Sequence, residues 1–151
     1  TGTPYLKQAQ DAAAKLNYSD CKVHEFVSKM DYAYAVADLV VSRAGAISVS
    51  ELCLVQKAAI LVPLPTAAED HQTHNARALT DRGAAVLVKD VDAVSELGST
   101  VLRLINDKDA LNGLHTAIAG LGTQNAAEMI AAEVIRLAQK APAQQVTAMN
   151  A

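Results

Sequence analysis

Aromatic side chains are scarce in this sequence, at 3% of the residues, with no Trp and a single Phe. Modules that bind nucleic acid by base stacking need planar side chains on their surface, so this scarcity argues against that class. Positive charge is also short, because 13 Lys and Arg face 16 Asp and Glu for a formal net charge of −3. A DNA or RNA binder needs a basic footprint. We therefore predict no nucleic-acid partner.

Cysteines and long apolar runs are few as well. The two cysteines, Cys21 and Cys53, cannot build a disulfide framework, and no Cys/His cluster has the spacing of a zinc finger. The longest apolar runs reach about half of a membrane span, so the sequence predicts no transmembrane helix. The chain begins TGTPYL, without Met or a targeting segment. We expect it to be a piece of a longer protein.

What is present is typical of one globular domain: 151 residues, 51% hydrophobic and 19% charged. Short apolar runs alternate with stretches of helical periodicity. The sequence predicts strands over 21–27, 38–42, 58–63 and 84–88, and helices over 3–16, 31–37, 48–55, 71–82, 91–106, 109–119 and 126–139. Strands that are apolar on both faces and alternate with helices indicate an α/β fold, a doubly wound parallel sheet.

Ligands of such a sheet bind at the carboxyl ends of its strands. Four strands are few for a complete sheet, so we expect a first strand or two upstream of Thr1. The tail over 141–151 shows no periodicity and is expected to be disordered.

The stretch DLVVSRAGAISVSE, residues 38–51, leads from a strand through a short loop into a helix. Such a junction aims backbone N–H groups and the positive end of the helix dipole at a ligand, and phosphate is the ligand they favour. Gly45 lets the backbone approach a ligand closely, but it is equally well interpreted as a turn residue. Glu51 also has two interpretations. It either accepts hydrogen bonds from a ribose diol or closes a capping box with Ser48, and spacing alone favours the cap.

A second polar stretch, PLPTAAEDHQTHN over 63–75, leaves a strand and enters a helix that we expect Asp70 to cap and Gly83 to follow. His71, Gln72 and Asn75 fall in the first turns of this helix, at the same edge of the sheet as the Gly45 loop. They also fit the polar start of a solvated helix. His71 and His74 share a helical face, but no third ligand has helical spacing, so we predict no metal site.

Together with CKVHEFVSKMDYAYAVAD upstream, DLVVSRAGAISVSE and ILVPLPTAAEDHQTHNARAL closely resemble the MurG family of UDP-N-acetylglucosamine transferases. The resemblance runs from Thr1 to about Lys140. It implies the GT-B architecture, in which two Rossmann-like domains face each other across a cleft. Residues 1–140 would be the C-terminal domain, which binds the UDP-sugar donor, without its first strands.

The resemblance also implies roles for single residues. The backbone of Val27 would read the uracil edge, the first amides of the helix would hold the α-phosphate, Glu51 would bind the ribose, and Gln72 the sugar hydroxyls. The implied donor site is Val27, Ala46, Ile47, Ser48, Val49, Ser50, Glu51 and Gln72, with Phe26, Met30, Gly45, His71 and Asn75 as further contacts. The family often has two glutamines where this chain has His71 and Gln72. It often has Gly and Pro where Gln56 and Ala58 flank Lys57.

The family's N-terminal domain carries the acceptor-binding loops, the candidate general base and the membrane-docking surface, and this sequence contains none of it. The implied reaction is inverting transfer of N-acetylglucosamine from UDP-N-acetylglucosamine to lipid I, giving lipid II in peptidoglycan synthesis. The full-length enzyme would work at the cytoplasmic face of the bacterial inner membrane. We expect no catalytic residue, metal or cofactor in this chain and no transfer by it alone.

Two other functions are compatible with parts of the pattern. The chain fits a free-standing donor-binding subunit of a two-chain GT-B transferase, which has a similar C-terminal motif. A plain flavodoxin-type or receiver-type scaffold fits less well, because neither an acidic phosphorylation pocket nor a flavin loop is visible.

Overall fold

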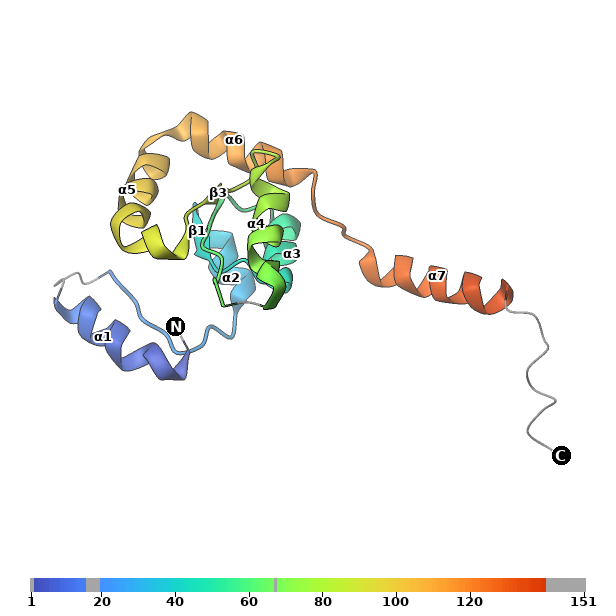
Figure 1. The fold of residues 1–151 in the computed structure, drawn as a ribbon, viewed down its shortest axis with the longest axis horizontal. Coiled ribbons are helices and arrows are strands. Elements are labelled where there is room, and N and C mark those ends of the chain that lie inside the picture. The colour runs from blue at the N-terminus through green and yellow to red at the C-terminus, as the bar shows by residue number, and fades with distance from the viewer. Residues whose placement is uncertain (1, 16–19, 67, 141–151) are drawn as a thin grey trace. The chain divides into compact units, whose positions relative to one another are not determined.

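The computed structural model describes residues 2–15, 20–66 and 68–140 (Figure 1). The tail expected to be disordered, 141–151, lies outside the described residues. The chain divides into two compact units, 1–38 and 39–151, and each is described by itself.

The first unit is mainly helical. It contains a short 3-10 helix, η1 (Thr3–Tyr5), then α1 (Leu6–Lys15) and α2 (Met30–Val36). The strand predicted over 21–27 is wrong, because these residues form no regular element. A strand needs a partner to complete its hydrogen bonds, and the described part of this unit offers none. Instead, the Glu25 carbonyl accepts a bond from the Gly2 N–H at 3.1 Å.

The second unit is built on a parallel sheet with the order β1-β2-β3. Its strands are β1 (Val40–Ser42), β2 (Ala59–Leu61) and β3 (Val86–Leu87). Three of the four predicted strands are thus confirmed, each shorter than predicted. Because all three run in the same direction, the loops that follow them meet at a single edge of the sheet.

Helices connect and cover these strands. They are α3 (Ala46–Val55), α4 (His71–Thr80), α5 (Ala93–Asn106) and α6 (Lys108–Ala119), with the 3-10 helices η2 (Ala68–Asp70) and η3 (Asp90–Asp92). The last helix, α7 (Ala126–Lys140), follows them and has no buried residue. Every helix predicted in this unit is confirmed, with shifted boundaries: α3 begins two residues earlier than predicted, α4 ends two residues earlier, and α5 begins two residues later, after η3. Figure 1 shows α3 and α4 on one side of the sheet and α5 on the other.

The core is centred on β2, whose three residues are all buried. Ala58, Ile60 and Val62 alternate along this segment and pack with Leu104 of α5 and Leu114 of α6. Since successive strand residues point to opposite faces, the intervening residues meet the other layer. Burial on both faces explains the uninterrupted apolar run that predicted this strand.

Both α3 and α4 end in the same hydrogen-bond pattern, a Schellman motif. At the end of α4 the N–H groups of Gly83 and Ala84 donate to Thr80 and Leu79, and Gly83 has a φ of +66°. Gly83 is thus the left-handed residue of the motif that closes α4, although the helix itself ends at Thr80. At the end of α3 the left-handed position is held by Gln56, with a φ of +55°.

The predicted cap at the start of α4 is wrong. Asp70 occupies the N-cap position, but its side chain makes no capping hydrogen bond. Glu69 and Asp70 both have a left-handed backbone, with φ of +49° and +56°. A capping side chain needs the extended backbone of a usual N-cap residue, and this kink takes Asp70 out of it.

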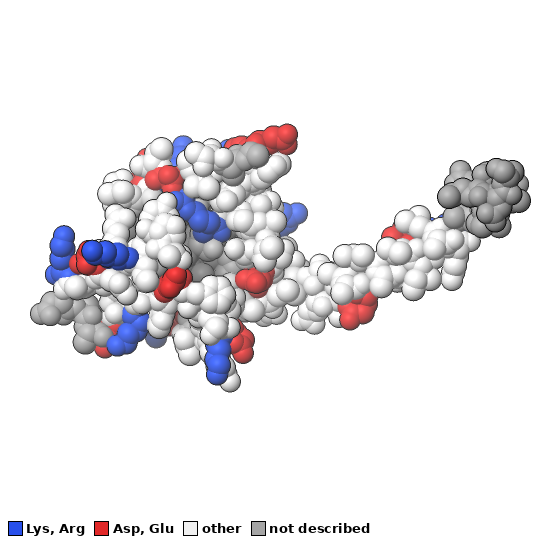
Figure 2. Space-filling model, turned by 90° about the horizontal axis from the view of Figure 1, so that it is seen from below, with Lys and Arg blue, Asp and Glu red and all other residues white. Residues whose placement is uncertain are grey.

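The last helix, α7, is amphipathic. Its exposed apolar side chains are Met129, Ile130, Val134, Ile135 and Leu137. Among the described helices, none is long and apolar enough to cross a membrane. On the face shown in Figure 2, basic and acidic residues are interspersed and form no continuous basic surface.

Candidate functional site

The two polar stretches singled out in the sequence lie at the same edge of the sheet. The chain leaves β1 at Ser42 and enters α3 at Ala46, and it leaves β2 at Leu61 and enters α4 at His71. Both connections follow the carboxyl ends of neighbouring parallel strands. This is the edge at which open α/β sheets bind ligands.

The start of α3 presents backbone N–H groups with no side-chain cap. Gly45 is the N-cap residue, and the first bond within the helix runs from the Val49 N–H to the Gly45 carbonyl at 3.0 Å. The helix itself therefore gives the N–H groups of Ala46, Ile47 and Ser48 no acceptor. No acidic residue lies in this first turn. The positive end of the helix dipole thus stays suited to an anion.

The early start of α3 overturns the capping-box interpretation of Ser48 and Glu51. Ser48 would have to be the N-cap residue, but it is the third residue of the helix. Glu51 instead lies one turn beyond Ile47 and Ser48 on the same helical face, and it is exposed. A carboxylate therefore follows the N–H groups along one side of α3.

Arg43, which sequence reasoning did not single out, ties the strand ends together. Its guanidinium donates to the Val62 carbonyl at 3.2 Å and to the Pro63 carbonyl at 3.5 Å, and it forms an ion pair with Asp90. These partners follow β2 and β3. A cation directly after an apolar strand was the available signal, but Asp90 lies 47 positions further along the chain.

Asn75 and Gln72 of α4 hold the two loops. The Asn75 amide donates to the carbonyl of the buried Ala44 at 3.0 Å, and the Gln72 side-chain oxygen accepts from the Leu64 N–H at 2.9 Å. Within the described residues nothing engages the Gln72 amide nitrogen, Nε2. Gln72 therefore offers a donor at this edge, while the amide group of Asn75 fixes the loop before α3.

His71 is exposed at the first position of α4. Its Nε2 lies 3.9 Å from a carboxylate oxygen of Glu69, and the two would pair when the imidazole is protonated. In the described ranges, no group of three or more His, Cys, Asp and Glu side chains is arranged to hold a metal ion. Among the described residues no third ligand joins His71 and His74, and the absence of a metal site stays a prediction.

Phe26, Val27 and Met30 belong to the other unit, where Phe26 and Val27 precede α2 and Met30 begins it. Phe26 is 81% exposed, and Val27 and Met30 are partly exposed. Ser50 is exposed in α3, Val49 is half-buried, and both follow the first turn. The roles of these residues in ligand binding stay predictions.

Among the described residues of α3 and α4, one pKa shift is resolved, that of Cys53, which lies in the last turn of α3 and away from this edge. Burial in α3 raises the pKa of its thiol. A thiol held protonated is a poor nucleophile. The groups at the edge itself, the N–H groups at the start of α3 and the Gln72 amide, suit the binding of a phosphate- and hydroxyl-bearing ligand.

Comparison with known proteins places the chain among glycosyltransferases. A family model described as "Glycosyltransferase family 28 C-terminal domain" matches residues 1–134. A crystal structure of Acinetobacter baumannii MurG matches with a TM-score of 0.80 and 29% identity, over 89% of this chain and 41% of that chain. This likeness confirms the predicted Rossmann-like α/β fold of a GT-B C-terminal domain.

Curated relatives share the name UDP-N-acetylglucosamine--N-acetylmuramyl-(pentapeptide) pyrophosphoryl-undecaprenol N-acetylglucosamine transferase. One from Porphyromonas gingivalis is 48% identical over 92% of this chain. One from Bacteroides fragilis is 46% identical over 93%. The chain spans 37% of the length of each of these relatives.

Proposed function

Since the chain belongs to the glycosyltransferase family 28 C-terminal domain family, we propose that it binds the UDP-N-acetylglucosamine donor of a transferase. That enzyme moves N-acetylglucosamine to the lipid-linked acceptor, lipid I, and gives lipid II. The observation that carries the proposal is the start of α3, where uncapped N–H groups precede the exposed carboxylate of Glu51. A nucleoside diphosphate needs an anion site and a ribose partner next to each other.

In this proposal the N–H groups of Ala46, Ile47 and Ser48 hold the α-phosphate, with Gly45 allowing its close approach. Glu51 accepts hydrogen bonds from the two ribose hydroxyls, one turn along the helix. Val49 and Ser50 complete the helix start at the nucleotide. We assign recognition of the uracil edge to the Val27 backbone, with Phe26 and Met30 near it in the chain. This assignment rests on the resemblance of residues 21–38 to the family and not on any contact with the second unit.

The sugar is assigned to α4. The Gln72 amide nitrogen donates to N-acetylglucosamine hydroxyls, while its oxygen stays on the Leu64 N–H. His71 is a further sugar contact at the exposed start of the helix. Asn75 acts by positioning, because its amide holds the Ala44 carbonyl in the loop before α3.

The chemistry of transfer then divides between two parts of the enzyme. The start of α3 stabilises the negative charge that develops on the departing diphosphate. Binding of the nucleotide fixes the anomeric carbon in position for inverting attack. We assign the acceptor's sugar and lipid, the general base and peripheral contact with the cytoplasmic face of the membrane to the part of the relatives' length that this chain does not span.

Calorimetry tests the donor site on the chain itself. We expect UDP-N-acetylglucosamine to bind, and Glu51→Gln to weaken binding by about tenfold, since a hydrogen bond to a charged group contributes about 1.5–3 kcal/mol. Gln72→Ala removes a sugar contact, so it should weaken the binding of UDP-N-acetylglucosamine more than the binding of UDP. Glu96→Gln, on the exposed surface of α5, is the matched control. Unchanged affinity for both site variants would refute the assignment.

The division of labour has its own test. The chain alone should not transfer N-acetylglucosamine to a lipid I analogue, because the site for the acceptor's reacting sugar and the base are assigned elsewhere. Product formation by these 151 residues would overturn that assignment.

A further inference from the structure

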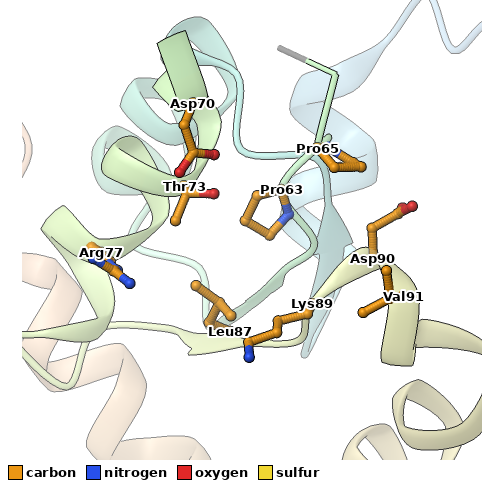
Figure 3. Close-up of a pocket in the computed structure, with 9 residues that line it drawn as sticks. All are labelled: Pro63, Pro65, Asp70, Thr73, Arg77, Leu87, Lys89, Asp90 and Val91. Atoms are coloured by element: carbon orange, nitrogen blue, oxygen red, sulfur yellow. The ribbon is translucent and has the colours of Figure 1, made fainter. Parts of the chain in front are cut away.

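A cavity of about 300 Å³ opens at the same sheet edge, between α4 and the residues that follow β2 and β3 (Figure 3). Its apolar lining comes from Pro63, Leu87 and Val91, and its polar lining from Asp70, Thr73, Arg77 and Lys89. None of these residues belongs to the proposed donor set. The volume is at the lower end of the usual range for ligand pockets, so the cavity suits a short segment of a ligand.

The cavity holds two cations that the described part of the protein leaves without a partner. Neither the Arg77 guanidinium nor the Lys89 ammonium group makes a hydrogen bond or an ion pair with a described residue. In Figure 3 the Arg77 side chain extends from α4 toward Leu87, and the Lys89 side chain lies beside Leu87. The carboxylate of Asp90 points away from the centre and is paired with Arg43. The cations therefore favour an anionic group in the cavity.

The other polar residues of the lining, Asp70 and Thr73, favour a ligand that also donates hydrogen bonds. The carboxylate of Asp70 and the hydroxyl of Thr73 lie at the start of α4 in Figure 3, and Arg77 follows further along the same helix. A carboxylate accepts N–H donors and repels phosphate. An occupant that matches both the two cations and the Asp70 carboxylate has a negative charge, N–H groups and some apolar surface. A peptide that ends in a free carboxylate has all three.

The cavity lies next to the proposed sugar site, because Gln72 and Thr73 are consecutive residues of α4. The name of the curated relatives describes an acceptor that contains a pentapeptide and a pyrophosphoryl group. Of these two, the peptide fits the carboxylate of Asp70, and the pyrophosphoryl group does not.

We propose that this cavity binds the carboxylate end of the acceptor's peptide, with Arg77 and Lys89 pairing the carboxylate and Asp70 accepting peptide N–H groups. The inference rests on the proposed function, since that function supplies the acceptor. It makes Arg77 and Lys89 determinants of acceptor specificity on the domain that binds the donor.

The test is an NMR titration of the ¹⁵N-labelled chain with N-acetylmuramyl-pentapeptide. We expect the amide signals of Thr73, Leu87 and Val91 to shift. The same ligand with an amidated C-terminus should bind about tenfold more weakly, since a charge-assisted pair contributes roughly 1.5–3 kcal/mol. Arg77→Gln and Lys89→Gln should each weaken the free-acid ligand in the same way. Arg103→Gln, on the exposed surface of α5, is the matched control and should change nothing.

Equal binding of the acid and the amide, or shifts absent from these residues, overturns the proposal. So does inorganic pyrophosphate if it moves these signals and the peptide does not. A separate titration with UDP-N-acetylglucosamine follows the amides of residues 46–51 and tests the donor site. A chain that binds the donor but not the peptide refutes only the cavity assignment. A chain that binds the peptide but not the donor refutes the proposed function.

Discussion

Arg43 and Asp90 form an ion pair that reaches across the end of β2 and ties the residue after β1 to the start of η3. The same guanidinium donates to the carbonyls of Val62 and Pro63. One side chain therefore links the ends of all three strands. Both partners are partly exposed, 51% for Arg43 and 34% for Asp90, so the pair contributes more to the placement of the loops than to stability.

Substitution of this pair separates the two contributions. We expect Asp90→Asn to lower the free energy of unfolding by no more than about 1 kcal/mol. Arg43→Met should cost more, about 1–2 kcal/mol, because it also removes the bonds to two carbonyls. Urea unfolding of both variants and of the double variant measures the coupling. Fully additive losses would contradict a direct interaction between the two residues.

Asn75 is expected to be the more sensitive residue at this edge. Asn75→Ala leaves the buried Ala44 carbonyl without the partner it now has, at a cost of about 1–3 kcal/mol. The substitution should also weaken binding of the UDP-sugar donor, because the loop before α3 loses the hydrogen bond that holds it. Asn112→Ala, exposed on α6, is the control. Urea unfolding and calorimetry of the two variants would contradict this view if they gave the same values.

The matching ends of α3 and α4 give opposite expectations for glycine. Gln56→Gly should stabilise the chain by about 1 kcal/mol, because glycine relieves the left-handed strain at φ +55°. Gly83→Ala should destabilise it by a similar amount. No atom lies within 4 Å of the added Cβ, so backbone strain is the only cause. Thermal unfolding should show melting temperatures shifted in opposite directions, and shifts of the same sign would refute the account.

Gly122 marks a close approach between the segment after α6 and the backbone of α3. A Cβ at this position would lie 2.8 Å from the Cys53 carbonyl oxygen and 3.2 Å from the Leu54 Cα. Neither atom moves without the helix, so Gly122→Ala should cost about 1–3 kcal/mol. Gly120→Ala is a matched control, since nothing lies within 4 Å of its Cβ. Urea unfolding midpoints that agree for the two variants would contradict the close approach.

The Cys53 thiol gives stability a dependence on alkaline pH. Its pKa is raised by burial above the ordinary value of 9.0, so the folded chain favours the protonated form. This contribution is fully present below pH 9.0 and is lost as the pH rises through the folded pKa. Urea unfolding from pH 7 to pH 11 should therefore show a steeper alkaline loss for the parent chain than for Cys53→Ala. Cys21→Ala, at an exposed position, should keep the parent's slope.

The sequence was sufficient to predict the sheet and the helices of the second unit, because the signals there are local. A fully buried strand such as Ala59–Leu61 is an unbroken apolar run, and Gly83 marks the end of a helix. The strand predicted over 21–27 was wrong because its stability would depend on a neighbouring strand. The cap assigned to Asp70 failed because the kink at Glu69 is not encoded by either residue type.

The candidate site was predictable to a different degree. The loop before α3 and the polar start of α4 were visible as motifs, and parallel strands bring them to one edge. The link between Arg43 and Asp90 was not visible, because it depends on the register of three strands. The interpretation of Ser48 and Glu51 as a capping box depended on a helix boundary that was two residues off. An error of two residues in the start of a helix was therefore enough to change the interpretation of Glu51 from a ligand-binding residue to a helix cap.

The sheet order also has a consequence for handling the isolated chain. In the described part of the protein β1 pairs only with β2, so its outer edge presents unpaired backbone donors and acceptors beside the 45%-exposed Val41. An open strand edge of this kind is a template for another strand. The purified chain will aggregate least when that edge is paired with a further strand of the same polypeptide, or when a charged substitution at Val41 disfavours pairing with another molecule.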